Sequence, residues 1–159
     1  MTATIRKAGL KDIDTLATHH NLMFEEIYSL KGNELNQSLL DSMYKSSVKK
    51  LSDEMPKGIC VAWIIEKKGQ IVGSGAISKV SMTSSPLDLR YIKAYLHSIY
   101  VIKDYRGKGL TKILLREVND YCKTNNIGTI LLLASDAGRP IYESVGYKKI
   151  ENFMSLYLN

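Results

Sequence analysis

The sequence predicts a single α/β domain, residues 1–159, built around a mixed sheet. Three observations lead to this fold class. The chain has 159 residues, a length that suits one domain better than two. Its apolar residues recur at steps of three and four in some segments and alternate or run together in others, which is typical of helices mixed with strands. The expected order is strand, two helices, three strands, helix, strand, helix and strand, and this order indicates helices packed on a mixed sheet.

The first third of the chain is expected to hold one strand and two helices. Residues 4–8 alternate weakly and predict a strand. Apolar side chains then repeat along one face from Ile13 to Leu30, which predicts an amphipathic helix capped by Asp12 or Asp14. A second, weaker helix is expected over about residues 34–51.

The hydrophobic period then changes to that of strands. Residues 59–65 form a compact apolar run that predicts a buried strand, and residues 71–77 follow a hairpin turn as its partner. Residues 81–88 are polar and contain a proline, so they are expected to be a loop. Residues 91–102 are rich in aromatic and β-branched side chains and predict a long strand.

The last third of the chain alternates helices with strands. A clear amphipathic pattern predicts a helix over residues 110–122, and a short apolar strand is expected over residues 129–134. A short helix over residues 140–145 and an alternating strand over residues 153–158 complete the chain. No linker or repeat interrupts this order, which supports one domain.

Composition and charge narrow the class of protein. The net charge is +6, from 22 Lys and Arg against 16 Asp and Glu, an excess compatible with a nucleic acid, an acidic small molecule or no ligand. The longest apolar run, Ile59 to Ile65, is far shorter than the roughly 18 residues of a membrane helix, so no membrane association is expected. Cys60 and Cys122 are too few for a disulfide framework and lack metal-ligand spacing. We therefore expect reduced thiols, no metal site and a cytoplasmic location.

A glycine turn between the long strand and the next helix is the strongest candidate for a ligand site. Gly107 and Gly109 let the backbone approach a ligand closely, and the free N–H groups and dipole of a helix start favour an anion. The turn fits neither the Walker A nor the dinucleotide-binding fingerprint. From the glycines alone, a plain turn with solvated lysines remains an equal alternative. Four basic residues gather there: Lys103, Arg106, Lys108 and Lys112.

The wider run from Tyr100 to Leu115 closely resembles the acetyl-coenzyme A binding segment of the Gcn5-related N-acetyltransferase (GNAT) superfamily. The family pattern [Q/R]-x-x-G-x-[G/A] matches as Arg106-x-x-Gly109-x-Thr111, with threonine in place of the usual glycine or alanine. The run from Ile141 to Tyr147 is similar to the late family motif Y-x-x-x-G-[F/Y]. The order of elements extends the resemblance over nearly the whole chain. It implies the GNAT (acyl-CoA N-acyltransferase) fold, with a mixed sheet of about six to seven strands and about four helices.

The resemblance also implies a cofactor site for acetyl-CoA. In the family, coenzyme A lies between the fourth and fifth strands, so the backbone of Ile99 and Val101 would meet its pantetheine and acetyl group. Ser135 falls where many members have an asparagine that contacts the cofactor. The main-chain N–H groups implied to hold the pyrophosphate are those of Arg106, Gly107, Lys108, Gly109, Leu110 and Thr111.

Two residues are the candidates for proton transfer. Tyr142 matches the family tyrosine that protonates the departing thiolate, and its alternative is an aromatic core residue. Some members use a strand glutamate as the base, but this chain has Tyr95 at that position. His97 is expected to face the same side as Tyr95 and Ile99, and its ordinary pKa of about 6.5 suits a base. A satisfied strand histidine and a water relay without a dedicated base remain open.

The acceptor is expected between the first two helices, the loop over residues 81–88 and the end of the fourth strand, with Glu25, Glu26 and Tyr95 as candidate contacts. The chain is thus predicted to transfer the acetyl group of acetyl-CoA to a primary amine of a small molecule or peptide, by direct attack in a ternary complex. The alternative is a non-catalytic acyl-CoA sensor of the same fold. A nucleic-acid binder has no supporting motif. Dimers are frequent in the family, which leaves a homodimer open.

Overall fold

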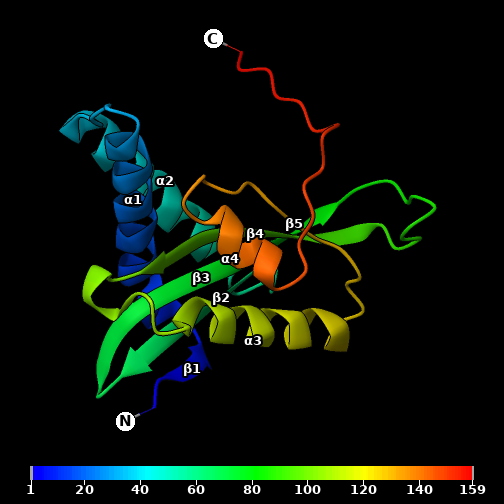
Figure 1. Ribbon diagram of the computed structural model, residues 1–159, viewed down its shortest axis with the longest axis horizontal. Coiled ribbons are helices and arrows are strands. Elements are labelled where there is room, and N and C mark those ends of the chain that lie inside the picture. The colour runs from blue at the N-terminus through cyan, green and yellow to red at the C-terminus, as the bar shows by residue number, and fades with distance from the viewer. Residues whose placement is uncertain (1, 159) are drawn as a thin grey trace.

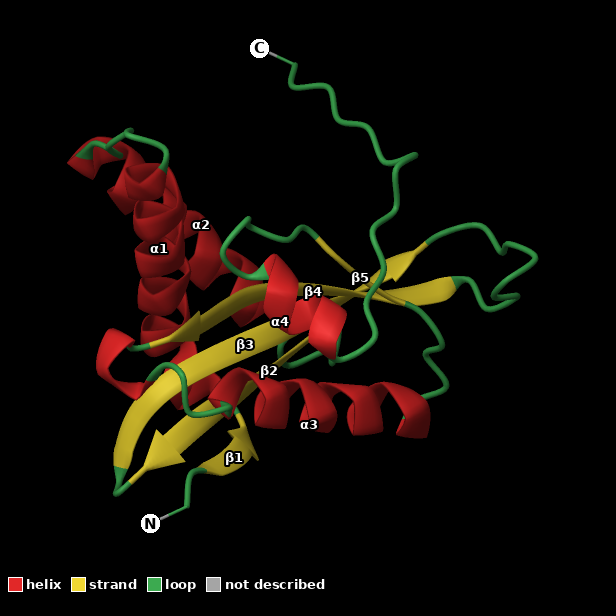
Figure 2. Ribbon diagram, viewed as in Figure 1, coloured by secondary structure: helices red, strands yellow, loops and turns green. Residues whose placement is uncertain are grey.

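A mixed sheet forms the centre of the computed structural model, which describes residues 2–158 (Figures 1 and 2). Five strands follow one another in the order β1-β2-β3-β4-β5. Neighbouring strands are antiparallel except β4 and β5, which are parallel. The strands are β1 (Thr4–Lys7), β2 (Cys60–Lys67), β3 (Gln70–Ser81), β4 (Ile92–Val101) and β5 (Ile130–Leu132).

The helices cover both faces of this sheet, as Figure 2 shows. Apolar side chains of α1 and α2 pack on one face, through Leu16 and Leu51, and those of α3 pack on the other face, through Leu114 and Val118. Tyr142 of α4 also packs against the core on the α3 face. The helices are α1 (Ile13–Leu30), α2 (Gln37–Glu54), α3 (Leu110–Thr124) and α4 (Arg139–Ser144), with short 3-10 helices η1 (Leu10–Asp12) and η2 (Lys103–Tyr105). Within the described residues, no helix is long and apolar enough to cross a membrane.

Burial on both faces explains the continuous apolar run that predicted β2. Alternate residues of β2 face opposite layers: Ile64 belongs to the core beneath α1 and α2, whereas Trp63 and Ile65 belong to the core beneath α3. A strand covered on both sides has no solvent-facing positions, so its sequence shows no polar alternation.

A β-bulge in β4 changes the direction of its side chains. Ser74 of β3 pairs with Tyr100 and Ala76 pairs with His97, so Ser98 and Ile99 together stand opposite Gly75. Ser98 has the positive φ of +58°. The extra residue inverts the alternation beyond it, and Ile99 packs on the α3 face, where a Cβ on Gly75 would meet both Ile99 and Leu114. The prediction that Ile99 shares a side with Tyr95 and His97 is therefore wrong for Ile99.

The strand expected over residues 153–158 is wrong as well. This segment, red in Figure 1, leaves the sheet as extended chain, and its apolar side chains are exposed, with Phe153 at 62% and Met154 at 90%. Alternation provides a face to bury, but a strand also needs a neighbour for its main-chain hydrogen bonds. The sheet accordingly has five strands instead of six to seven, while the four helices agree with the prediction.

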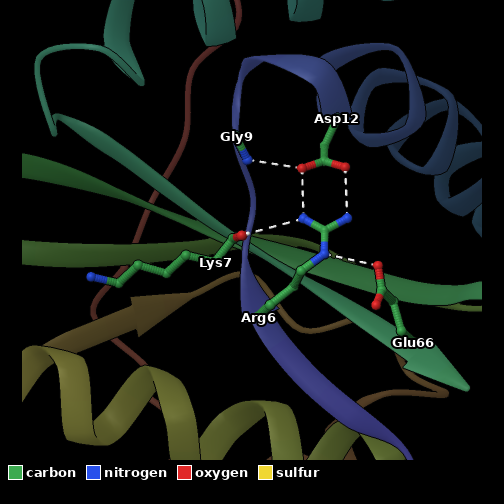
Figure 3. Close-up of polar contacts among 5 residues, drawn as sticks. All are labelled: Arg6, Lys7, Gly9, Asp12 and Glu66. Carbon is green, nitrogen blue, oxygen red and sulfur yellow. Dashed lines mark hydrogen bonds and ion pairs between the residues drawn. The ribbon is translucent and has the colours of Figure 1, made fainter. Parts of the chain in front are cut away.

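Asp12 stands at the start of α1, but its carboxylate does not cap that helix. Instead, Arg6 of β1 donates to both carboxylate oxygens, at 2.8 and 2.9 Å, and the N–H of Gly9 donates to one of them at 2.8 Å. Figure 3 shows this arrangement. The Nε of Arg6 also donates to Glu66 of β2. Asp12 is buried, and its hydrogen bonds with Arg6 hold the pKa of the carboxyl below its ordinary value. This cluster fixes β1 to the beginning of α1.

Replacing Arg6 with methionine leaves the buried carboxylate of Asp12 without its cation and is expected to destabilise the fold by about 2 kcal/mol. This is less than the roughly 3–5 kcal/mol for a fully buried pair because the Arg6 side chain is partly exposed. The expected loss corresponds to a decrease in Tm of about 4–8 °C. Because the pKa of Asp12 is lowered in the fold, the stabilisation is present above the unfolded pKa of about 3.9 and is lost as the pH falls through the folded value. Thermal unfolding measured from pH 7 down to pH 3 should therefore show that the difference in Tm between the wild type and Arg6→Met becomes smaller. Lys49→Met, which removes the exposed Lys49–Asp53 pair, is the control; an equal loss in both variants would contradict this role for Arg6.

Candidate active site

A cleft opens where β4 and β5 separate. β5 pairs with β4 only from Ala94 to Leu96, whereas β4 continues to Val101 and the chain after β5 turns away toward α4 (Figure 1). The resulting cleft has a volume of about 1430 Å³ and extends to α1 and α2. This is larger than the roughly 300–1,000 Å³ of an ordinary small-molecule pocket, so the cleft has room for a large ligand or for two ligands together.

The glycine turn forms one end of this cleft. Gly107 and Gly109 adopt φ values of +73° and +76°, and Gly109 is the N-cap residue of α3. The main-chain N–H groups of residues 107–112 donate to no acceptor among the residues that the structure describes. Successive free N–H groups at the positive end of a helix dipole form an anion site. The geometry of the turn thus agrees with the anion site expected from the glycines.

Two of the four clustered basic residues line the cleft. Lys112 does so without an acidic partner in the described structure. Arg106 also lines it, but its guanidinium is fixed, because Nε donates to the carbonyl of Val101 at 2.7 Å and the other end pairs with Glu26 at 2.9 Å. Lys108 instead donates to the carbonyl of Asp104. Lys108 and Lys103 do not belong to the cleft lining.

The free edge of β4 offers main-chain groups to the cleft. Ile102 donates its N–H to Val72 of β3, so by alternation the main-chain groups of Val101 and Ile99 face the opposite edge, where β5 no longer pairs. The carbonyl of Val101 accepts from Arg106, and its N–H remains for a ligand. The side chain of Ile99 faces α3, but its backbone lies at this free edge of β4.

Tyr142 reaches the cleft from α4. Its ring stacks edge-on against Tyr147, with ring centres 5.7 Å apart, and a Cβ on Gly138 would come within 3.2 Å of the ring. Ser135 also lines the cleft, and its hydroxyl accepts the N–H of Gly138, which fixes the turn into α4. Burial raises the pKa of Tyr142 to about 12. The phenol is therefore fully protonated at neutral pH and is available as a proton donor.

All three histidines of the chain lie between α1 and the β3–β4 face. His97 hydrogen-bonds Ser78 through Nε2 at 2.8 Å and Ser98 through Nδ1 at 2.9 Å, and the same Ser98 hydroxyl lies 2.7 Å from Nδ1 of His20. Burial lowers the pKa of His97 to about 4 and also lowers the pKa of His20. His19 makes a separate hydrogen bond with Ser74.

Ser98 and His20 are residues of the cleft that sequence reasoning missed. His20 follows Leu16 by four residues and Ala17 by three, and this spacing on the apolar face of the first helix was a signal that its side chain faces the sheet. For Ser98 there was no signal, because a bulge and a positive φ at a non-glycine residue depend on tertiary contacts.

The end of the cleft where the acceptor was expected contains only some of the predicted residues. Tyr95 lines the cleft and stacks on His97 at 5.7 Å, and Glu26 lines it while pairing with Arg106. Glu25 is exposed and is not part of the cleft lining, and neither is the loop over residues 82–88. Apolar side chains of α1 form the rest of this wall: Leu16, Met23, Phe24, Ile27 and Leu30.

Neither cysteine belongs to the cleft. Cys60 and Cys122 are buried free thiols, and burial raises the pKa of both. Across residues 2–158, no group of three or more His, Cys, Asp or Glu side chains is arranged to hold a metal ion.

Comparison with known proteins identifies the family of this chain. The family model described as "Acetyltransferase (GNAT) domain" matches residues 28–154. The chain is 29% identical over 98 residues to N-acetylaspartate synthetase of Danio rerio, covering 60% of this chain and 32% of that protein. It is 29% identical over 82 residues to N-alpha-acetyltransferase RimI of Mycobacterium tuberculosis, covering 52% of this chain and 48% of that protein. The matched region thus spans about a third and about half of these curated relatives.

Solved structures match over nearly the whole chain. A predicted acetyltransferase of Clostridium acetobutylicum, crystallised with acetyl-CoA, superimposes with a TM-score of 0.82 at 26% identity, covering 98% of this chain and 96% of that one. A GCN5-related N-acetyltransferase of Ralstonia eutropha superimposes with a TM-score of 0.87 at 18% identity, covering 98% and 99%. The second likeness shows a shared fold.

Proposed function

Because this chain belongs to the GNAT acetyltransferase family, we propose that it is an N-acetyltransferase that transfers the acetyl group of acetyl-CoA to a primary amine. The observation that carries this proposal is the row of free main-chain N–H groups over residues 107–112, at the end of the cleft between β4 and β5. A diphosphate needs several donors on a concave backbone, and this turn offers them at a helix start. The similar protein of Clostridium acetobutylicum, which was crystallised with acetyl-CoA, supports the same ligand here.

The chain's own groups would orient the thioester in the cleft. The N–H groups of the glycine turn bind the pyrophosphate, and Lys112 adds positive charge at the rim. The main-chain groups of Ile99 and Val101 bind the pantetheine along the free edge of β4. The N–H of Val101, at the edge of β4 that β5 leaves unpaired, would donate to the carbonyl oxygen, where negative charge develops during the attack by the amine. Direct attack in a ternary complex requires both substrates in one cleft, and the volume of about 1430 Å³ accommodates them.

Proton transfer accompanies the exchange of bonds. The amine nitrogen forms a bond to the acetyl carbonyl carbon, the carbon–sulfur bond breaks, and the thiolate leaves. Tyr142 donates its phenolic proton to that sulfur, since burial keeps the phenol protonated. The amine loses a proton to the pair formed by His97 and His20, which stay neutral at pH 7 because burial lowers the pKa values of both.

The acceptor is a primary amine of an amino acid, another small molecule or a peptide. The names of the two curated relatives, N-acetylaspartate synthetase and N-alpha-acetyltransferase, both describe acetylation of nitrogen. Tyr95 and the carboxylate of Glu26 line the acceptor end of the cleft and are proposed to contact the amine.

An acceptor screen with the purified chain tests this function. The protein is incubated with acetyl-CoA and with amino acids, polyamines, aminoglycosides and peptides that have free N-termini, and free thiol release and the acetylated product are measured. We expect thiol release that depends on one class of amine, with a matching acetylated product. Tight binding of acetyl-CoA by calorimetry without amine-dependent thiol release would instead support a sensor, and the absence of binding would refute both functions.

A further inference from the structure

We propose that His20 is the general base of the acyl transfer and that Ser98 and His97 are positioning residues that hold it in the reactive tautomer. This inference rests on the proposed function, because it assigns the group that takes the proton from the acceptor amine. The three side chains and Ser78 form one hydrogen-bonded chain from α1 to β3, and all four line the cleft.

The hydrogen bonds of His97 argue against its acting as the base itself. Both of its ring nitrogens are occupied, Nε2 by Ser78 at 2.8 Å and Nδ1 by Ser98 at 2.9 Å. An amine would have to displace a serine hydroxyl to reach either nitrogen. In His20 only Nδ1 is engaged, by Ser98 at 2.7 Å, and no group among residues 2–158 hydrogen-bonds its Nε2. That nitrogen is the ring position of the cluster that is open to a substrate.

Counting the protons in the hydrogen bonds from His20 to Ser78 defines the reactive tautomer. A serine hydroxyl has one proton, so Ser98 can donate to only one of the two Nδ1 atoms and must accept from the other. When Ser98 donates to His97, it accepts the Nδ1–H of His20, and Nε2 of His20 is left with a free lone pair. His97 then carries its proton on Nε2 and donates it to Ser78. This arrangement satisfies every hydrogen bond and presents a base to the cleft.

The backbone of β4 is shaped to bring these groups together. Regular alternation would direct Ser98 to the α3 face, opposite His97. The bulge places both side chains on the α1 side, and Ser98 does so in the left-handed region, at φ +58°. Residues other than glycine rarely adopt this conformation, and backbone strain of this kind is concentrated at functional sites.

The surroundings keep His20 neutral before it takes a proton. Its ring packs edge-on against Phe24 of the same helix, with centres 5.0 Å apart, and burial lowers its pKa. The pKa of His97 is lowered by burial and, in addition, by the positive charge of Lys50 of α2. Other titratable groups on this face are His19 of α1, bonded to Ser74, and two tyrosines of β4: Tyr95, stacked on His97, and Tyr100, in ring contact with His19. Cys60 of β2 lies beside Ser78, and Glu26 of α1 lines the same cleft but pairs with Arg106. None of the hydrogen bonds of these histidines within the described chain involves a carboxylate.

The proton balance of the step is complete. As the nitrogen–carbon bond forms, the N–H proton of the attacking amine moves to Nε2 of His20, giving an imidazolium whose Nδ1–H still donates to Ser98. The carbon–sulfur bond breaks, and the sulfur receives the proton of Tyr142. After the products leave, His20 releases its proton to water and Tyr142 regains one, so the cleft returns to its starting state.

Matched substitutions at adjacent histidines test the assignment of the base. His20→Asn keeps an amide group near the Nδ1 position to hydrogen-bond Ser98 but removes the base, and we expect kcat to decrease by about 100-fold. The affinity for acetyl-CoA should stay within about twofold, and the acidic limb of the kcat–pH profile should disappear. His19→Asn, the same change one residue earlier, should leave kcat and the profile as in the wild type. A His20→Asn variant with wild-type kcat and the same acidic limb would overturn the proposal.

Nitrogen chemical shifts test the positioning role without any turnover. At pH 7 we expect His20 in the Nδ1–H tautomer, and Ser98→Gly, which removes the hydroxyl but suits the positive φ, should shift the titrations of both His20 and His97 but not that of His19. A Nε2–H tautomer at His20, or titrations that Ser98→Gly leaves unchanged, would overturn the proposal. Failure of the wild-type protein to acetylate any amine would refute the proposed function instead, and the chemical shifts would still decide the tautomer.

Discussion

Replacing Gly109 with valine is expected to abolish acetyl-CoA binding, with Kd raised by roughly 100-fold or more, about 2.7 kcal/mol. Gly109 adopts φ +76° at the N-cap of α3, a conformation that a β-branched residue avoids. A Cβ at this position would meet no protein atom within 4 Å, so the new side chain would occupy open space beside the N–H groups proposed to hold the pyrophosphate. Both effects keep the phosphates from the backbone. Calorimetry with acetyl-CoA measures the change directly.

Gly58→Val is the matched control for this experiment. Gly58 also has a positive φ, +66°, and a Cβ there would likewise meet no atom within 4 Å. Gly58 precedes the start of β2. The glycine turn lies toward the other end of β2, because Tyr105, just before the turn, donates to Gln70 at the start of β3. We expect a similar loss of thermal stability in both variants but normal acetyl-CoA binding in Gly58→Val. Normal binding by Gly109→Val would contradict the anion site at the glycine turn.

Removing the phenolic hydroxyl in Tyr142→Phe is expected to lower kcat by roughly 10²–10⁴-fold while acetyl-CoA affinity is nearly retained. The leaving thiolate then lacks its proton donor, but the ring still packs against Tyr147 and beside Gly138. Because burial raises the pKa of Tyr142 to about 12, the phenol stays protonated up to strongly alkaline pH. Its ionisation therefore should not limit the rate below about pH 10. Steady-state kinetics with the amine identified by the screen measure the effect.

Tyr147→Phe provides the same deletion on the neighbouring ring. Tyr147 packs against Tyr142 but does not line the cleft. Its Oη is buried without a hydrogen-bond partner in the described structure, so its removal sacrifices no hydrogen bond. We expect wild-type kcat for Tyr147→Phe. An unchanged kcat for Tyr142→Phe would remove Tyr142 as the acid, and an equal decrease in both variants would indicate disturbed packing instead.

The regular elements of this fold are encoded locally, and most of them were predictable for that reason. The apolar repeat from Ile13 to Leu30 gives the bounds of α1 because a helix face repeats every three to four residues. The run within β2 identified a buried strand because helices cover both faces of the sheet there. The segment over residues 153–158 has the alternation of a strand but lacks a paired neighbour. Alternation could not reveal this, because strand pairing is a long-range contact.

The residues of the candidate site also differ in whether local sequence or long-range contacts position them. The glycine turn and Tyr142 were predictable because short motifs specify them, and the structure places both at the cleft. The direction of Ile99 was not predictable, since one extra residue in the bulge reverses the alternation of β4 beyond Ser98. His20 and His97 are distant in the sequence, and only the packing of α1 on the sheet brings both of them to one serine hydroxyl.

By itself, the sequence determined the fold class, the order of helices and strands up to α4, and a turn rich in glycine and basic residues at the start of α3, where an anion site was expected. These features follow from hydrophobic periodicity and from the conformational freedom of glycine, which act over a few residues. Only the tertiary structure decided where β4 leaves β5, which side chains the bulge directs into the cleft, and which histidine keeps an open nitrogen. These features depend on contacts between segments far apart in the chain, because strand register and hydrogen-bond partners are fixed only when those segments meet.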